Sequence, residues 1–205
     1  MPENFEENEH LEKFYEHLKT HGPVYNPHSF PTQLKFLQSR FRQESELYSS
    51  LEETPGSKNY IFDRTIFEFW SVFALSHFKS GLMNKDEYEK YMAVFAQLLP
   101  KIRLPDLMIY LKLDSSKLHQ RIQSRGREME KDISAEYLQG LEDLYGNFIE
   151  RFRQLGVEVI EINTESKDEY PKVIERIRKL QTDKMRDDTT KVEFQQVQPK
   201  LEVEI

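Results

Sequence analysis

Two short β-type runs constrain the fold of this chain more than any other feature of its sequence. Residues 107–111 read LMIYL, and residues 157–162 read VEVIEI. The continuous apolar run is typical of a strand covered on both faces, and neither run approaches the ~20 apolar residues of a membrane span. A third strand is expected at residues 59–62 (NYIF). Strands separated by helices predict an α/β protein with a parallel sheet surrounded by helices.

The helices are expected where apolar residues recur every three or four positions. In the first of them, Leu11, Phe14, Tyr15 and Leu18 share one face. The predicted helices cover residues 8–20, 30–51, 66–79, 85–99, 115–124, 133–155 and 168–180. Asn84 is expected to cap the fourth of them. The Gly- and Pro-containing segment 21–29 predicts a loop, and residues 54–57 (TPGS) predict a break between helix and strand.

The composition fits a single globular domain followed by a polar tail. The 205 residues are 38% hydrophobic and 12% aromatic, and aromatic residues are what disordered chains lack. Residues 183–205 have no helical periodicity, so we expect a disordered tail there, with a stray edge strand as the alternative. Residues 1–182 then form the folded domain.

The charge and the termini exclude several functional classes. A net charge of −7 argues against a general nucleic-acid-binding surface, and the lack of cysteine excludes disulfides. The acidic N-terminal stretch has no apolar core, so it predicts neither a signal peptide nor a transit peptide. We therefore expect a cytoplasmic protein that does not contact a membrane, with a mitochondrial location as the alternative if the N-terminus is truncated.

The segment 121–130 (RIQSRGREME) is the most informative motif. Arg121 and Arg125 are four residues apart and project from one helix face. Guanidinium groups suit phosphate oxygens because their planar donors bind in pairs. From spacing alone, a solvated helix end with ion pairs to Glu128 and Glu130 is the more common arrangement.

Asp63 and Arg64 are the second candidates, because they follow the strand expected at 59–62. Ligands of α/β proteins bind at the carboxyl ends of parallel strands. An aspartate there can hold Mg²⁺, and an arginine can stabilise a phosphoryl group in transfer. The equally weighted alternative is an aspartate that merely caps the helix beginning at Ile66.

Other polar residues give weaker signals. Gln33 and Arg40 lie seven residues apart, near one stripe of a helix, and an amide can read a nucleobase edge. Taken alone, a solvent-facing glutamine is more common. His17 and His21 are four residues apart without a suitable third ligand, which argues against a zinc site. The motif Gly-x-x-x-x-Gly-Lys-Ser/Thr, which cradles phosphates in P-loop proteins, does not occur in the sequence.

Taken together, these segments resemble the deoxynucleoside kinase family, collinearly from about Glu3 to Leu180. Residues 8–15 are similar to its Asn-Pro-x-Leu-x-x-Phe-Tyr segment, and residues 30–42 to its base-binding helix. Residues 63–65 resemble its Asp/Glu-Arg-Ser motif, and residues 121–130 its phosphate-binding lid. The resemblance implies a P-loop nucleoside kinase fold and ATP-dependent transfer of a phosphoryl group to a deoxyribonucleoside in nucleotide salvage. The resemblance is also compatible with a homodimer.

The resemblance also implies which residues perform the transfer. Arg64 would contact the 5′-oxygen and the phosphoryl group, and Asp63 would help to hold Mg²⁺. Glu3 falls where the family keeps the carboxylate that activates the 5′-hydroxyl, with Glu6 and Glu7 as neighbouring alternatives.

Further residues would bind the two substrates. Gln33 and Arg40 would face the base, and Tyr15 and Glu130 would hold the ribose 3′-hydroxyl. Three arginines would close over the phosphates of ATP as the lid: Arg121, Arg125 and Arg127.

The sequence departs from the family pattern at its beginning and at one base-facing position. The family starts with a strand, a P-loop and a helix, and we expect this chain to begin at or just after that unit. Whether these 205 residues transfer phosphate therefore stays open, and the alternative is an inactive remnant or truncated gene product that binds nucleoside or a protein partner. Phe69 stands where many members carry a base-reading aspartate, so the base preference cannot be transferred.

Overall fold

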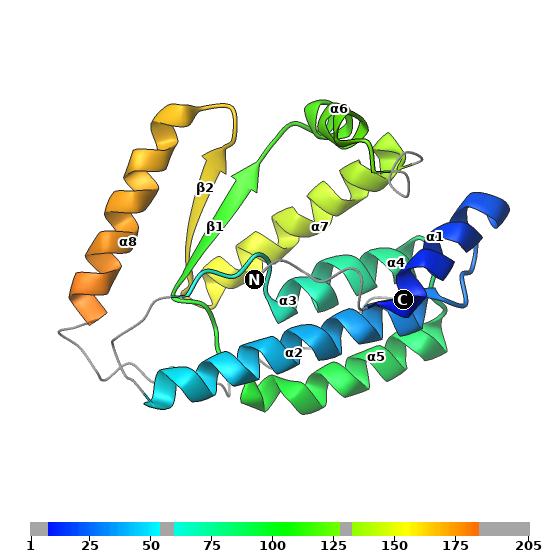
Figure 1. Ribbon diagram of the computed structural model, residues 1–205, viewed down its shortest axis with the longest axis horizontal. Coiled ribbons are helices and arrows are strands. Elements are labelled where there is room, and N and C mark those ends of the chain that lie inside the picture. Colours follow the sequence, from blue (N-terminus) through cyan, green and yellow to red (C-terminus); the bar gives the residue numbers. More distant parts are fainter. Residues whose placement is uncertain (1–7, 54–59, 128–132, 185–205) are drawn as a thin grey trace. The chain divides into compact units, whose positions relative to one another are not determined.

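The computed structural model describes residues 8–53, 60–127 and 133–184, and its elements are shown along the chain in Figure 1. The chain forms two compact units. The first comprises Met1–Arg103 and Leu113–Ile149, and the second comprises Leu104–Lys112 and Glu150–Ile205. No helix in the described ranges is both long and apolar enough to cross a membrane.

The first unit begins with α1 (Glu9–His21), which the periodicity predicted. Asn8 caps it by accepting a hydrogen bond from the backbone N–H of His10 at 3.2 Å. Leu11 and Phe14 are buried on its inner face. The Asn8 amide also donates to the carbonyl of Thr32 at 3.1 Å, so the same residue ties α1 to the next helix.

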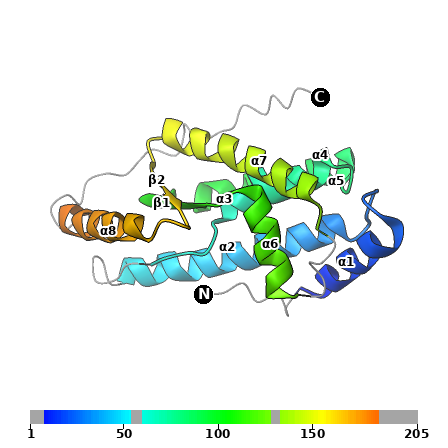
Figure 2. The same cartoon turned by 90° about the horizontal axis from the view of Figure 1, so that it is seen from above.

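The longest helix, α2 (Ser29–Glu53), contacts α1 and also α5 (Lys85–Leu98). Figure 2 shows α1 beside the first turns of α2. The loop between them is held by buried Asn26, which donates to the carbonyl of Phe14 at 2.9 Å and accepts from the N–H of His28 at 3.0 Å. The start of α2 is therefore fixed by side chains, not only by its own helical bonds.

The predicted helix at 66–79 has three parts. A short α3 (Ile66–Glu68) leads into the π-helix η2 (Phe69–Ala74), and α4 (Leu75–Lys79) completes it. The wide π turn was not predicted, because apolar spacing does not distinguish it from an α-helix; such turns are frequent at functional sites. Gly81, at φ 75°, takes the left-handed conformation after the helix ends.

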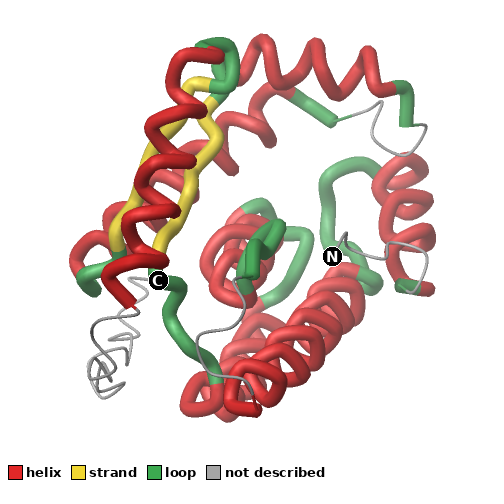
Figure 3. Tube along the Cα trace, turned by 60° about the vertical axis from the view of Figure 1, so that its left-hand side comes forward, coloured by secondary structure: helices red, strands yellow, loops and turns green. Residues whose placement is uncertain are grey.

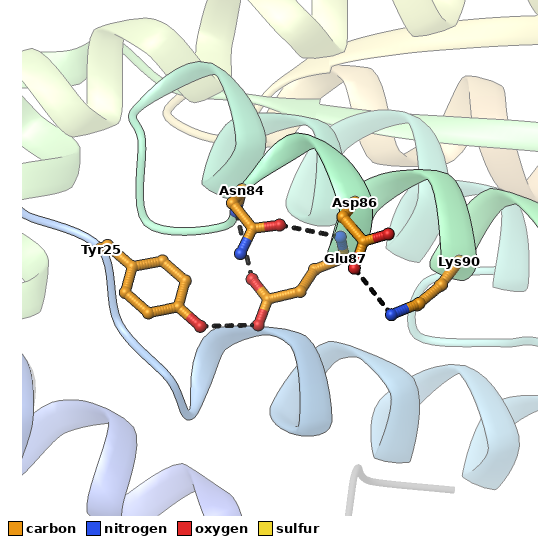
Figure 4. Close-up of polar contacts among 5 residues, drawn as sticks. All are labelled: Tyr25, Asn84, Asp86, Glu87 and Lys90. Carbon is orange, nitrogen blue, oxygen red and sulfur yellow. Dashed lines mark hydrogen bonds and ion pairs between the residues drawn. The ribbon is translucent and has the colours of Figure 1, made fainter.

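Helix α5 begins with the predicted cap at Asn84. Its side chain accepts from the N–H of Glu87 at 2.9 Å, and the Glu87 carboxylate accepts from the N–H of Asn84 at 3.1 Å. Figure 4 shows that Tyr25, from the loop before α2, donates its hydroxyl to the same carboxylate at 2.9 Å. On the next turn, Lys90 pairs with Asp86. This cluster anchors the loop that leads into α2.

The core of the first unit is formed by aromatic and aliphatic side chains of α2, α3, η2 and α5. Its fully buried members include Leu37, Ile66, Phe67, Val72, Tyr91 and Phe95. The α5 helix continues into the short 3₁₀ turn η3 (Leu99–Lys101). Two further helices follow later in the chain, α6 (Ser115–Arg125) and α7 (Ala135–Gln154), and the last five residues of α7 belong to the second unit.

The second unit contains the parallel pair β1 (Leu107–Lys112) and β2 (Glu158–Asn163), with Leu107 opposite Glu158. Figure 3 shows the two strands side by side. A short 3₁₀ turn, η5 (Lys167–Glu169), leads into the last helix, α8 (Tyr170–Lys184). Arg176 of α8 binds the Glu158 carboxylate with two guanidinium nitrogens. The parallel pairing and both strand positions confirm the α/β prediction.

The third predicted strand is wrong where it can be assessed. Residues 60–62 form an irregular segment, residue 59 lies outside the described ranges, and the Ile61 side chain is 80% exposed. A strand is defined by hydrogen bonds to a neighbour, and a short apolar run carries no information about that neighbour. The expectation that residues 107–111 are covered on both faces also differs from the structure, because Leu111 is 56% exposed.

Two other expectations lie largely outside the described residues. The break at 54–57 is not described. Of the tail expected at 183–205, only residues 183 and 184 are described, and they close α8.

Candidate functional site

Gln33 and Arg40 are both buried on α2, at 4% and 2% exposure. They lie two turns apart, as their spacing indicated, and the more common arrangement of a solvent-facing glutamine is wrong here. Polar side chains are seldom buried without a partner, and charged ones least of all. Their burial therefore marks this face of α2 as something other than plain hydrophobic packing.

Arg40 holds the segment that carries the next two candidates. Its Nη2 donates to the backbone carbonyl of Asp63 at 2.8 Å. Its guanidinium lies 6.0 Å from the ring centroid of Phe62 and 5.8 Å from that of Phe69. The buried cation is thus surrounded by aromatic faces and fixed to the backbone, which stabilises it away from water.

Phe69 therefore packs against Arg40. Its ring is 3% exposed and stacks on that of Phe36 at 5.8 Å. A base-reading aspartate at position 69 would present a carboxylate to Arg40. In this chain the Phe69 ring lies near the Arg40 guanidinium, at 5.8 Å.

Arg64 occupies an unusual backbone conformation with φ 65°. Its guanidinium lies 4.7 Å from the ring centroid of Phe73, a residue near the end of the π-helix η2. Asp63 and Arg64 are exposed, so both charged groups can reach a ligand. The capping alternative for Asp63 is wrong, because the residue that caps α3 is Thr65.

Two buried carboxylates that sequence reasoning missed support this loop. Glu44 of α2 accepts from the N–H of Ile66 at 2.9 Å and from the Tyr48 hydroxyl at 3.0 Å. Glu68 accepts from the N–H of Thr65. Burial raises the pKa of both carboxyl groups.

One of these carboxylates had a readable signal in the sequence. Thr65-x-x-Glu68 is a capping-box pattern. For Glu44, the only signal in the sequence was its position four residues after Arg40, on the same helix face.

Tyr15 lies half-buried on α1, and a second tyrosine connects it with Arg64. Burial raises the pKa of Tyr137, a residue of α7, with Tyr15 acting in the same direction and Arg64 opposing it. The three side chains are therefore close enough to interact electrostatically. Tyr137 was not predicted as a site residue.

His77 of α4 was also missed. Its Nε2 lies 3.3 Å from Nε2 of Gln33, and its Nδ1 lies 2.8 Å from the Ser29 hydroxyl. The ring stacks on Phe14 with centroids 4.9 Å apart and planes at 10°. Burial lowers the pKa of His77 to about 4. No local pattern relates positions 29, 33 and 77, so only the fold could reveal the cluster.

The remaining predicted residues lie on or near α6 or outside the described ranges. Arg121 and Arg125 are exposed on the last turns of α6, and Arg127 follows Gly126, which ends the helix at φ 68°. Their role as phosphate ligands stays a prediction. Glu3 and Glu130 lie outside the described residues, so their predicted roles stay predictions as well.

The Asp63 carboxylate is suited to bind a magnesium ion. In the described part of the chain, no three His, Asp or Glu side chains converge as a metal site. Mg²⁺ in phosphoryl-transfer sites is typically held by one or two carboxylates together with substrate phosphates and water. The exposed carboxylate of Asp63, adjacent to Arg64, fits that requirement.

Comparison with known proteins relates the whole arrangement to one family. The model of the family described as deoxynucleoside kinase matches residues 1–182. A deoxyadenosine kinase of Dictyostelium discoideum is 36% identical over 80% of this chain and 62% of its own length. A deoxyadenosine/deoxycytidine kinase of Bacillus subtilis is 33% identical over 73% of this chain and 64% of its own length. The chain thus spans less than two thirds of either relative.

A solved structure shares the fold. A deoxyadenosine kinase from M. mycoides, determined with the products dCMP and dCDP, superposes with a TM-score of 0.69. The match covers 87% of this chain and 85% of the other at 23% sequence identity. This likeness concerns the fold alone.

Proposed function

This chain belongs to the deoxynucleoside kinase family, and we propose that it transfers the γ-phosphoryl group of ATP to the 5′-hydroxyl of a deoxyribonucleoside. The hydrogen bond from buried Arg40 to the Asp63 carbonyl carries this proposal. It joins the helix that would face the base to the loop that would face the phosphates. Catalysis of phosphoryl transfer depends mainly on such positioning and on charge stabilisation.

Arg64 has the central role in the proposed reaction. Its guanidinium would donate to the oxygens of the phosphoryl group as negative charge develops there. The exposed Arg121, Arg125 and Arg127 would bind the phosphates of ATP, since guanidinium pairs match phosphate oxygens. Glu3 would take the proton of the 5′-hydroxyl.

Asp63 would hold a magnesium ion beside Arg64. When bound, Mg²⁺ neutralises phosphate charge and polarises the phosphoryl oxygens. The Arg40 hydrogen bond holds the backbone of Asp63, from which this carboxylate extends.

The nucleoside would bind against α2 and α1. Gln33 and Arg40 would face the base, and Tyr15 and Glu130 would hold the ribose 3′-hydroxyl. The names of the two relatives above point to amino-bearing bases, so we propose deoxyadenosine or deoxycytidine as the substrate. Cytoplasmic nucleotide salvage and a homodimer complete the proposal, and cell fractionation and analytical ultracentrifugation test them.

A phosphoryl-transfer assay tests the reaction. The purified 205-residue protein is incubated with [γ-³²P]ATP, Mg²⁺ and each of the four deoxynucleosides, beside a longer form that adds an upstream strand, P-loop and helix. Labelled deoxynucleoside 5′-monophosphate is expected, dependent on Mg²⁺. Saturable nucleoside binding without labelled product in either form would favour a binding protein and overturn the proposal of a kinase.

A further inference from the structure

Ser29, His77 and Gln33 form a buried hydrogen-bonded chain between α2 and α4. The imidazole of His77 has Ser29 at one nitrogen, at 2.8 Å, and Gln33 at the other, at 3.3 Å. The three residues are 0%, 4% and 4% exposed. Phe14 covers one ring face. The ring is therefore fixed at both edges and on one face.

The proton of the ring can be assigned from its neighbours. Because burial lowers the pKa of His77 to about 4, the ring is neutral at physiological pH, with one donor and one acceptor nitrogen. The Gln33 group that faces it is the amide nitrogen, which can only donate. With the amide in this orientation, Nε2 of His77 accepts, and Nδ1 carries the proton and donates to the Ser29 hydroxyl.

The amide of Gln33 is left with unsatisfied hydrogen-bonding capacity. Its oxygen Oε1 is buried and has no partner in the structure. Most buried polar atoms in proteins are paired, and one that is not is costly. The oxygen and the remaining N–H of the amide together suit a ligand edge that offers one donor and one acceptor.

We infer that His77 is a positioning residue that holds the Gln33 amide in one orientation and so selects the class of nucleobase. The inference rests on the proposed function, in which Gln33 faces the base. An amide that can rotate by 180° exchanges its donor and acceptor, and can pair with either an amino or an oxo base. An amide fixed by His77 pairs well with one class of base and poorly with the other. With the substrates proposed above, the favoured class is the amino bases adenine and cytosine, and the disfavoured class is the oxo bases guanine and thymine.

Nucleoside binding by calorimetry tests this selection. The dissociation constants of deoxyadenosine, deoxycytidine, deoxyguanosine and thymidine are measured for the wild-type 205-residue protein and for His77→Leu. Two correctly formed hydrogen bonds discriminate between bases by roughly 5- to 150-fold, so the wild type should prefer the amino bases by such a factor. In His77→Leu the amide is free to rotate, and the preference should fall to within about twofold.

Two serine variants test the role of the proton. Ser29→Ala removes the acceptor that keeps the proton on Nδ1, so the ring can donate to Oε1 and turn the amide; the preference should fall. Ser76→Ala is the matched control, because Ser76 is buried and next to His77 in the sequence but does not take part in the hydrogen bonds that link Ser29, His77 and Gln33. Its preference should equal that of the wild type. Each preference is a ratio within one variant, so a general loss of stability does not imitate the effect.

The outcomes separate the inference from the proposed function. If the wild type binds none of the four deoxynucleosides, the proposed function fails and the inference with it. If the wild type discriminates and His77→Leu discriminates equally, the function stands and the inference is overturned. Nitrogen-15 NMR of the wild-type imidazole needs no variant: a proton on Nδ1 supports the inference, and a proton on Nε2 overturns it.

Discussion

Among the residues that the structure describes, Arg64 alone combines a side chain with a left-handed backbone. This conformation costs roughly 1–2 kcal/mol for a residue other than glycine. Its neighbours hold it on both sides: Arg40 binds the carbonyl of Asp63, and Glu68 binds the N–H of Thr65. Backbone strain that the surroundings maintain in this way is typical of functional sites. The side chain at position 64 is thus retained against a cost that glycine would remove.

Two replacements of Arg64 measure the strain of its backbone without the contribution of its side chain. Arg64→Gly should be more stable than Arg64→Ala by about 1 kcal/mol, because alanine keeps the strain and glycine relieves it. Urea denaturation of the two variants measures the difference. At Gln120, an exposed residue in the middle of α6, the same pair should show the usual reverse order, with alanine more stable. Equal stability of the two Arg64 variants would show that the left-handed backbone is not strained.

His77 should give the protein a distinct pH dependence. Between about pH 6.5 and about pH 4, the unfolded state binds a proton at His77 that the folded state excludes. The free energy of unfolding therefore falls as the pH falls through this window. At about 1.4 kcal/mol per pKa unit, the loss approaches roughly 3 kcal/mol below pH 4.

Carboxyl groups also change protonation in this pH range, but they do so in both proteins. The difference between the wild type and His77→Leu therefore isolates the contribution of His77. Urea denaturation at pH 7.5, 6, 5 and 4 should give a shallower pH dependence for the variant. Parallel curves for the two proteins would contradict a buried, neutral histidine.

At the scale of elements, helices were predictable and strands only partly so. Helix periodicity and caps are local, so residues such as Asn84 mark a helix start without knowledge of the fold. Strand pairing depends on a partner far along the chain, which is why residues 107–111 were identified correctly and residues 59–62 were not. The π-helix η2 escaped prediction because its apolar pattern also fits an α-helix.

The α6 helix offers the sharpest test of a whole element. Replacing Arg121 and Arg125 together with glutamine should change stability by about 0.5 kcal/mol or less, because both are exposed. Affinity for a deoxynucleoside should stay the same. Affinity for a nucleoside–ATP bisubstrate dinucleotide should fall by roughly a hundredfold or more, since two charge-assisted contacts of about 1.5–3 kcal/mol each are lost. Calorimetry at constant ionic strength measures both affinities.

The control for α6 removes a positive charge from another turn of the same helix. Lys117→Gln lies on the first turn of the same helix and should leave both affinities unchanged. Equal dinucleotide affinity in the wild type and the double variant would show that these arginines form an ordinary solvated face.

At the scale of the molecule, the residues proposed to bind the nucleoside and Arg64 belong to the first compact unit where they are described. Gln33, Arg40, Asp63 and Arg64 could be proposed from the sequence because they fall within motifs that resemble a family. Ser29, His77 and Glu44 could not, since their partners lie 22 to 48 residues away and no spacing rule relates them. The sequence therefore indicates the groups that would touch a ligand, and the fold adds the groups that hold them.

The central claim is that Arg64 stabilises the phosphoryl group in transfer, and the turnover of Arg64→Lys tests it most directly. Lysine keeps the charge and the backbone cost but loses the forked donor geometry. In the form of the protein that is active with ATP and deoxyadenosine, kcat should fall about a hundredfold or more, by analogy with the loss of a transition-state donor. The dissociation constant of deoxyadenosine, measured by calorimetry, should stay unchanged. A kcat close to that of the wild type would contradict the account and leave Arg64 a structural residue.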